Sequence, residues 1–260
     1  MKSKGNSSRA LHSAMGVMVF AFTLVASGLL AQSATEIYKS AGDLYKQKQF
    51  SEAAVSYEKL LAQGYRSADV YYNLGNCYFK MDSIGKCILN YERALRLAPG
   101  DEDAAHNLRL AALRTVDKIE PVPQLAILTW WNHMLEFYTS ATWASFSLLV
   151  LWLAWLVGAV GLLLGRKRIS FSVAGFLTML SFVFLFFALV QRQHENATNR
   201  AILMAASANV KSAPDDNAGN LFLLHEGTRL QILDRVGEWN KIRLEDGKVG
   251  WVPRRLTEVI

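Results

Sequence analysis

The chain has 260 residues, 52% of them hydrophobic, and its 28 Lys and Arg residues exceed its 22 Asp and Glu residues by a formal charge of +6. Three basic residues precede Ala10 and three more form the run 166–168, so the remaining 22 basic residues equal the acidic ones in number. A protein that binds nucleic acid gathers its excess positive charge on one folded face. This distribution argues against that class and suits targeting and membrane segments instead.

Residues 1–33 have the pattern of a secretory signal peptide. A basic start leads into an acid-free apolar stretch from about Ala14 to Leu30, and small residues follow at 31–33. We expect the mature chain to begin near Ala34. The alternative is an uncleaved N-terminal membrane anchor, which would leave the next segment on the same outer side of the membrane.

Residues 37–100 repeat themselves with an offset of 34 residues, which is typical of stacked helical hairpins. In the second unit, eight signature positions are filled by Tyr71, Leu74, Gly75, Tyr78, Cys87, Tyr91, Ala94 and Pro99. This pattern resembles the tetratricopeptide repeat (TPR), and the first unit follows it more loosely because Ser40 and Tyr65 replace the expected leucine and proline. Asp101 is expected to cap a closing helix over about 102–115. We predict a helical TPR domain at 34–117, marginally stable alone because two repeats and a cap fall short of the usual three.

Two apolar stretches follow a connector at 118–142, whose aromatic rings we expect at the level of the lipid headgroups. No residue is charged between Glu136 and Arg166 or between Arg168 and Arg192. Each gap exceeds the roughly 20 residues that a spanning helix needs. We predict transmembrane helices at 143–164 and 169–190. The turn at 165–168 is basic, so the positive-inside rule places it in the cytoplasm and both flanking domains outside.

After a linker at 191–197, the hydrophobic pattern changes to a period of two. Apolar residues alternate along short runs, and tight-turn sequences separate them at 236–237 and 246–247. This predicts an all-β barrel at 198–260. The segments 224–228 and 250–253, the latter containing Gly-Trp-Val, resemble bacterial SH3 domains. The predicted fold class is therefore a multidomain membrane protein with TPR hairpins, two transmembrane helices and an SH3-like barrel.

Catalytic chemistry finds little support in the sequence. The five histidines fall in five different segments, and the largest unassigned piece, 118–142, is far smaller than a catalytic domain. We predict no catalytic residue, no metal site and no cofactor, and therefore a protein that is not an enzyme. For the two cysteines, Cys77 and Cys87, two buried thiols are favoured over a disulfide.

Binding surfaces remain as the candidate sites. By analogy with TPR peptide grooves, the concave face would use inner-helix positions. In the barrel, two tryptophans could line a ligand cleft. The alternative in both domains is that these side chains serve packing, and too few lysines and asparagines are present for a chaperone-type carboxylate clamp. The candidate partner-binding residues are Tyr38, Tyr45, Tyr72, Asn76, Phe79, Lys80, His106, Trp239 and Trp251.

The order of signal, TPR with the motif at 71–76, paired membrane helices and terminal SH3 domain resembles the BatE-type proteins of the Bacteroides aerotolerance (Bat) operon. This resemblance implies an inner-membrane protein that acts in the periplasm beside von Willebrand A-domain membrane proteins and a MoxR-type ATPase. It further implies a role in oxidative-stress tolerance or envelope maintenance. Two other interpretations remain open: an envelope anchor whose SH3 domain binds peptidoglycan, and a membrane sensor or an enzyme of unrecognised type.

Overall fold

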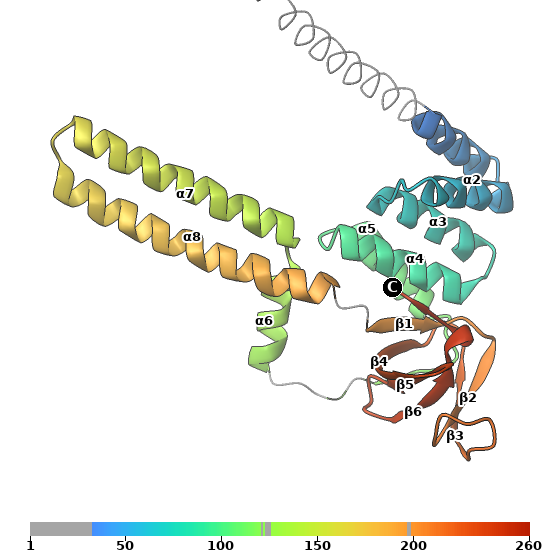
Figure 1. Cartoon of the computed structure of the whole chain (residues 1–260). Coiled ribbons are helices and arrows are strands. Elements are labelled where there is room, and N and C mark those ends of the chain that lie inside the picture. Colours follow the sequence, from blue (N-terminus) through green and yellow to red (C-terminus); the bar gives the residue numbers. More distant parts are fainter. Residues whose placement is uncertain (1–32, 121, 123–125, 197–198) are drawn as a thin grey trace, which may run out of the picture. The chain divides into compact units, whose positions relative to one another are not determined.

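A computed structural model describes residues 33–120, 122, 126–196 and 199–260 (Figure 1). The predicted signal peptide lies outside these residues apart from Ser33, so its prediction stays untested. The chain divides into two compact units, 1–66 and 67–260.

The first unit contains one helical hairpin, formed by residues 33–46 and α2 (Phe50–Ala62). Ala41 and Ala53 are fully buried, and such small residues let two helices approach closely. The ring of Tyr38 meets that of Tyr57 edge-on, with centroids 5.7 Å apart. This is the predicted first hairpin.

The turns of both hairpins contain a residue other than glycine in the left-handed region. Lys48 has φ 63° and Asp82, 34 positions later, has φ 58°. A side chain in this region costs roughly 1–2 kcal/mol per residue, whereas glycine adopts it freely. The repeat period is therefore visible in the backbone as well as in the sequence.

Replacing Lys48 with glycine is expected to stabilise the first hairpin by about 0.5–1 kcal/mol, because the relieved strain exceeds the entropy that glycine adds to the unfolded chain. Hydrogen exchange of residues 33–66 in the detergent-solubilised chain measures the effect. Gln47→Gly is the matched control, because Gln47 does not have a positive φ and should lose stability on the same change.

In the second unit, α3 (Ala68–Lys80), α4 (Ile84–Leu97) and α5 (Glu102–Ala112) form the second hairpin and its closing helix. The Asp101 side chain accepts a hydrogen bond from Ala104 N–H at 3.0 Å, as its predicted capping role requires. Gly75 faces the ring of Tyr91 so closely that a Cβ atom would lie 2.7 Å from it. The two helices of the second hairpin therefore approach each other closely at Gly75.

Three helices follow: α6 (Ala126–Glu136), α7 (Ser140–Leu163) and α8 (Lys167–Asn196). The apolar parts of α7 and α8 have mean hydropathies of 2.3 and 2.5 and are long enough to cross a bilayer, which is compatible with a two-pass membrane protein. The predicted turn is shorter than expected, because Lys167 already belongs to α8. The predicted linker at 191–197 is helical up to Asn196, since neither glycine nor proline interrupts the sequence there.

The α7–α8 contact depends on small residues. The Ser147 hydroxyl lies 2.9 Å from the Ser181 carbonyl oxygen, and the Ser181 hydroxyl donates back to the Ser147 carbonyl at 3.0 Å. Near the turn, a Cβ atom on Gly161 would stand only 2.0 Å from the Ser170 Cβ atom. Close backbone approach of this kind is how membrane helices pack.

Gly161→Ala is therefore expected to push α7 and α8 apart and to destabilise the hairpin by about 1–3 kcal/mol, the usual cost of overpacking. An SDS titration in mixed micelles measures the loss. Gly175→Ala is the matched control, because nothing lies within 4 Å of the new methyl group. Equal effects of the two changes would contradict the packing described.

The C-terminal part, which we term the β-domain (residues 199–260), is an antiparallel sheet with the strand order β3-β2-β6-β5-β4-β1-β7 (Figure 1). Gly237 and Gly247 have positive φ angles and lie in the tight turns predicted at these positions. Buried residues alternate with exposed ones and form a single core that includes Val210, Ile242 and Val252. The elements are β1 (Arg200–Leu203), β2 (Ser207–Lys211), β3 (Asn220–His225), β4 (Arg229–Val236), β5 (Trp239–Arg243), β6 (Val249–Pro253), a 3-10 helix (Arg254–Leu256) and β7 (Thr257–Val259).

Candidate functional site

A polar network occupies the predicted groove of the second hairpin. Asn76 Oδ1 accepts hydrogen bonds from the Tyr91 hydroxyl at 2.6 Å and from Asn107 Nδ2 at 3.1 Å. Asn107 Nδ2 also lies 3.1 Å from the Tyr72 hydroxyl. Two predicted site residues, Tyr72 and Asn76, are thus brought together, and Asn107 joins them although the sequence did not single it out.

The other groove residues are less closely grouped. Phe79 lies under the guanidinium of Arg114, 4.1 Å from its ring centroid, so Arg114 covers part of the predicted aromatic surface. Lys80 and His106 are exposed on α3 and α5. Tyr38 and Tyr45 lie on the helix at 33–46 in the first unit, where Tyr45 packs against Phe50 with ring centroids 5.2 Å apart. Their role in binding remains a prediction.

The β-domain contacts the second hairpin directly, which the sequence did not predict. The carboxylate of Asp117, just after α5, accepts hydrogen bonds from His225 N–H at 2.7 Å and from the Thr228 hydroxyl at 2.7 Å. Its other oxygen lies 2.9 Å from His225 Nδ1. The Asp117 side chain is only 15% exposed. We name residues 225–228, from the last residue of β3 to the residue before β4, the docking turn.

Burial by itself would raise the pKa of Asp117. The hydrogen bonds from Thr228 and His225 outweigh burial, and the pKa of this carboxyl lies below its usual value. Because the folded state holds the carboxylate, its contribution to stability is complete above the unfolded pKa of about 3.9 and is lost as the pH falls through the lower folded value.

Docking is therefore expected to be insensitive to Asp117 titration between pH 7 and about pH 5 and to weaken only in strong acid. Hydrogen exchange of residues 220–230 across a pH series measures this, after correction for the intrinsic exchange rate. Asp117→Asn is the control, since it lacks the titrating group and should lose the acid step. An Asp117-dependent weakening already complete at pH 6 would contradict the expectation.

The other two residues of the docking turn contact α4. Ser83, at the start of α4, makes no side-chain capping bond, and Glu226 Oε1 instead accepts a hydrogen bond from Gly85 N–H at 2.8 Å. Gly227 has φ +85°, and a Cβ atom there would lie 3.0 Å from Thr115 and 3.1 Å from Ile88. Glu226 of the β-domain thus caps the N-terminus of α4. Gly227 makes the closest contact with the hairpin, at a backbone conformation that favours glycine.

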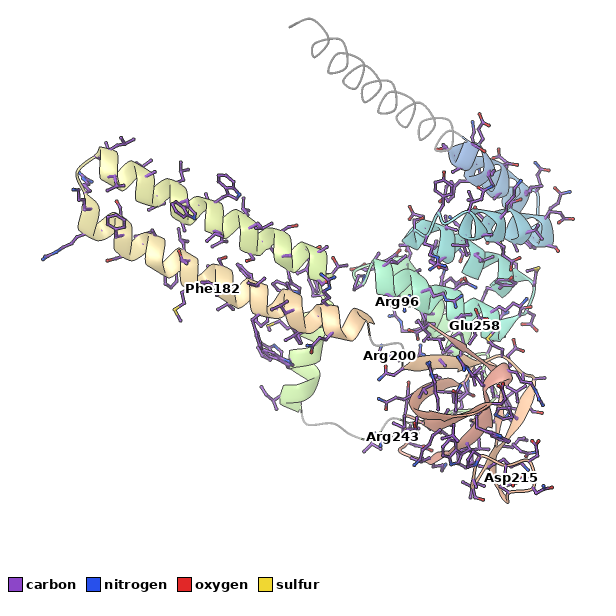
Figure 2. The ribbon with its side chains drawn as sticks, in the orientation of Figure 1. Arg96, Phe182, Arg200, Asp215, Arg243 and Glu258 are labelled. Atoms are coloured by element: carbon purple, nitrogen blue, oxygen red, sulfur yellow. The ribbon has the colours of Figure 1, made fainter. Side chains whose placement is uncertain are left out.

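Charged pairs extend this contact along α4. Glu92 pairs with Arg229 at 2.6 Å, and Arg93 pairs with Glu258 at 2.9 Å while also donating to the carbonyl oxygen of Val259 at 2.8 Å. Arg96 donates to the carbonyl oxygen of Ile260. Figure 2 shows Arg96 and Glu258 on the two facing parts. Arg96 lies three positions after Arg93 and four after Glu92, so both pairs are neighbours on the surface of α4.

Three of residues 117–120 and 122, which we name the strap, contact the β-domain. Asp117 holds the docking turn, Ile119 packs against the core, and Val122 N–H donates to the Glu245 carbonyl oxygen at 3.0 Å. The predicted connector at 118–142 therefore begins as part of the β-domain. Burial of the apolar Ile119 side chain against this core favours the contact.

The alternating core, the tight turns and the curled antiparallel sheet agree with the sequence resemblance noted above. Residues 206–258 match the bacterial SH3 domain family. Residues 68–101 match the tetratricopeptide repeat family, and they cover α3 and α4. A search of curated proteins found no match. Both kinds of domain are typically non-catalytic binding modules; TPR domains bind proteins, and bacterial SH3 domains bind proteins or peptidoglycan.

On the SH3 domain, the two predicted tryptophans lie on the outer face of the sheet. Trp251 is paired across the strands with Lys241 on one side and Lys211 on the other, and Lys241 Nζ lies 5.8 Å from the Trp251 ring centroid. Trp239 is paired with Pro253 on the neighbouring strand. Both indoles are half-buried, whereas the intervening Asn240 and Val252 point into the core. This face combines aromatic surface with positive charge.

The thiols of Cys77 and Cys87 are free and fully buried, as predicted. Burial raises the pKa of both to about 12, so neither is a reactive thiolate at neutral pH. In the part of the chain that the structure describes, no three His, Cys, Asp or Glu side chains gather as a metal site.

Proposed function

We propose that this chain is a two-pass membrane scaffold that binds protein partners on the outer side of the bilayer through its TPR helices and its SH3 domain. The observation that carries the proposal is the direct contact between α4 and the docking turn. Two domains in contact must lie on the same side of a membrane. The segment between them therefore crosses an even number of times, which supports the assignment of α7 and α8 as a transmembrane pair.

Charge distribution supports the orientation. The run Arg166–Lys167–Arg168 lies at the α7–α8 turn, and no Lys or Arg occurs from Ile119 to Gly165. By the positive-inside rule the turn faces the cytoplasm, and the TPR and SH3 domains face the periplasm. The inner membrane of a bacterium is the location that this arrangement fits.

For the cellular role, the resemblance to BatE-type proteins is the guide. We propose a Bat-like complex in which von Willebrand A-domain membrane proteins and a MoxR-type ATPase system are the partners and aerotolerance or envelope stress is the process. The groove residues on α3 and α5 and the outer face of the SH3 domain are the proposed contact surfaces.

Affinity purification in mild detergent tests this proposal. The wild-type chain is expected to recover a stoichiometric partner, and the double variant Lys80→Glu with His106→Ala is expected to lose most of it, at least about tenfold. Lys59→Glu is the matched control, because Lys59 is also an exposed lysine and lies on α2. Recovery of no stoichiometric partner by the wild-type chain would overturn the scaffold function.

A second function is favoured by one observation on the SH3 domain, the flanking of Trp251 by Lys211 and Lys241. An aromatic ring can stack on a sugar, and the lysines can pair with carboxylates of peptidoglycan. Sedimentation of the full chain with purified cell wall tests it, and Trp251→Ala should abolish the sedimentation. An equal sediment from both proteins would exclude this site, and a sensor role would then remain for the domain.

A further inference from the structure

The short helix α6 has both buried and exposed large apolar side chains. Leu135 is fully buried, its carbonyl oxygen accepts a hydrogen bond from Trp143 Nε1 at 3.3 Å, and the Trp131 ring meets Phe187 edge-on at 5.7 Å. Ile127, by contrast, is 65% exposed and Trp130 is 59% exposed. Residues three apart on a helix share a side, so these two large apolar side chains form one exposed surface.

The contacts of α6 place it at one end of the α7–α8 hairpin. Trp143 lies in the first turn of α7, and Phe187 lies in the last apolar stretch of α8, shortly before Arg192. Next to α6, Phe137 is 65% exposed, and Tyr138 packs edge-on against Trp143 with centroids 5.3 Å apart. Aromatic residues gather in this way where a membrane helix meets water.

We propose that α6 lies in the membrane–water interface and inserts its Ile127 and Trp130 side chains among the lipids. This inference rests on the proposed membrane insertion of α7 and α8. An indole suits this position because its ring is apolar while its N–H group can still bond to water or a headgroup.

The charge of the segment around α6 indicates which lipids it contacts. From Ile119 to Gly165 the chain contains no Lys or Arg. The segment therefore offers no lysine or arginine to anionic headgroups, and burial of apolar surface is the main source of binding. A neutral bilayer is the expected partner, and adding anionic lipid should change little.

The strap connects the SH3 domain to α6 by a short stretch of chain. Val122 is bonded to Glu245 of the SH3 domain, and Ala126 begins α6 only four residues later, a distance of at most about 14 Å for an extended chain. On the return path, four residues separate Asn196, the end of α8, from Arg200, the start of β1. Both connections hold the SH3 domain close to the bilayer surface.

A spin label at Ile127→Cys in the full chain, reconstituted in phosphatidylcholine vesicles, tests the proposal through collisions with oxygen and with a water-soluble nickel complex. The native thiols are buried and leave the new cysteine as the reactive one. We expect the label at 127 to be at least threefold less accessible to nickel than a label at Val55→Cys on α2. Its accessibility to oxygen should approach that of a label at Phe182→Cys on α8. Adding phosphatidylglycerol should leave both values unchanged. Phe182, 64% exposed, is shown in Figure 2.

Three outcomes would overturn the proposal. A label at 127 as accessible to nickel as that at 55 would place α6 in water, and exclusion of both reagents would place its surface against protein. A strong dependence on anionic lipid would contradict the neutral contact. If the label at Phe182→Cys were itself exposed to nickel, the membrane insertion in the proposed function would fail instead. Trp130→Cys provides the second variant and should repeat the result at 127.

Discussion

Asp117→Ala is expected to detach the docking turn and to lower the free energy of unfolding of the SH3 domain by about 3 kcal/mol. The change removes a carboxylate that accepts bonds from His225 N–H, His225 Nδ1 and the Thr228 hydroxyl. Each hydrogen bond to a charged group contributes roughly 1.5–3 kcal/mol, and buried donors left without a partner add their own cost. Hydrogen exchange of residues 199–260 and of α4 measures the loss in both parts.

Asp216→Ala is the matched control, because this exposed aspartate lies in the loop between β2 and β3, away from the docking turn. It should change exchange by no more than a surface substitution does, within about 0.5 kcal/mol. A similar effect of the two variants, or an SH3 domain unaffected by Asp117→Ala, would show that the strap does not hold the domain.

Gly227→Val is expected to be as damaging, at roughly 3–4 kcal/mol, for two separate reasons. The residue has φ +85°, a conformation that a β-branched side chain resists, and its new Cβ atom would lie 3.0 Å from Thr115 and 3.1 Å from Ile88. Backbone strain should account for about 1–2 kcal/mol and overpacking for the rest. A shift of the urea midpoint of SH3 unfolding gives the total.

Gly237→Val separates the two causes. Gly237 also has a positive φ, of +53°, but nothing lies within 4 Å of a Cβ atom there. This variant should therefore show the backbone strain alone. Equal losses at the two glycines would mean that contact with α4 and Thr115 contributes nothing to the fold of the SH3 domain.

Much of the fold followed from periodic patterns in the sequence. The 34-residue offset identified the hairpins, two charge-free gaps identified α7 and α8, and glycines identified the turns of the sheet. These features are local, so a short window of sequence contains the whole signal. Helix ends were less accurate, as α8 shows by continuing to Asn196, because several residues near an end are compatible with either state.

The docking of the SH3 domain on α4 could not be predicted in this way. Asp117 and His225 are 108 positions apart, and no pattern in a single sequence connects such residues. Arg93 and Arg96 resemble the solvated face of an ordinary amphipathic helix until their partners are seen. The segment containing Glu226 and Gly227 was identified as SH3-like, yet its contact surface on α4 is a property of the tertiary structure.

For the candidate site, sequence position indicated which residues share a helix but not what covers them. Tyr72 and Asn76 are both hydrogen-bonded to Asn107, whereas Phe79 is partly covered by Arg114, a residue 35 positions later. Trp239 and Trp251 fell on the outer face because the core residues alternate with them. Partner binding by any of these residues stays a prediction until a partner is found.

We propose that the TPR helices and the SH3 domain lie together on the outer side of the membrane. Labelling single cysteines in intact spheroplasts with a membrane-impermeant thiol reagent tests it most directly. We expect His106→Cys on α5 and Arg243→Cys on β5 to be labelled without permeabilisation, and Lys167→Cys at the α7–α8 turn only after it. Labelling at position 167 in intact spheroplasts, or labelling at only one of positions 106 and 243, would contradict this arrangement.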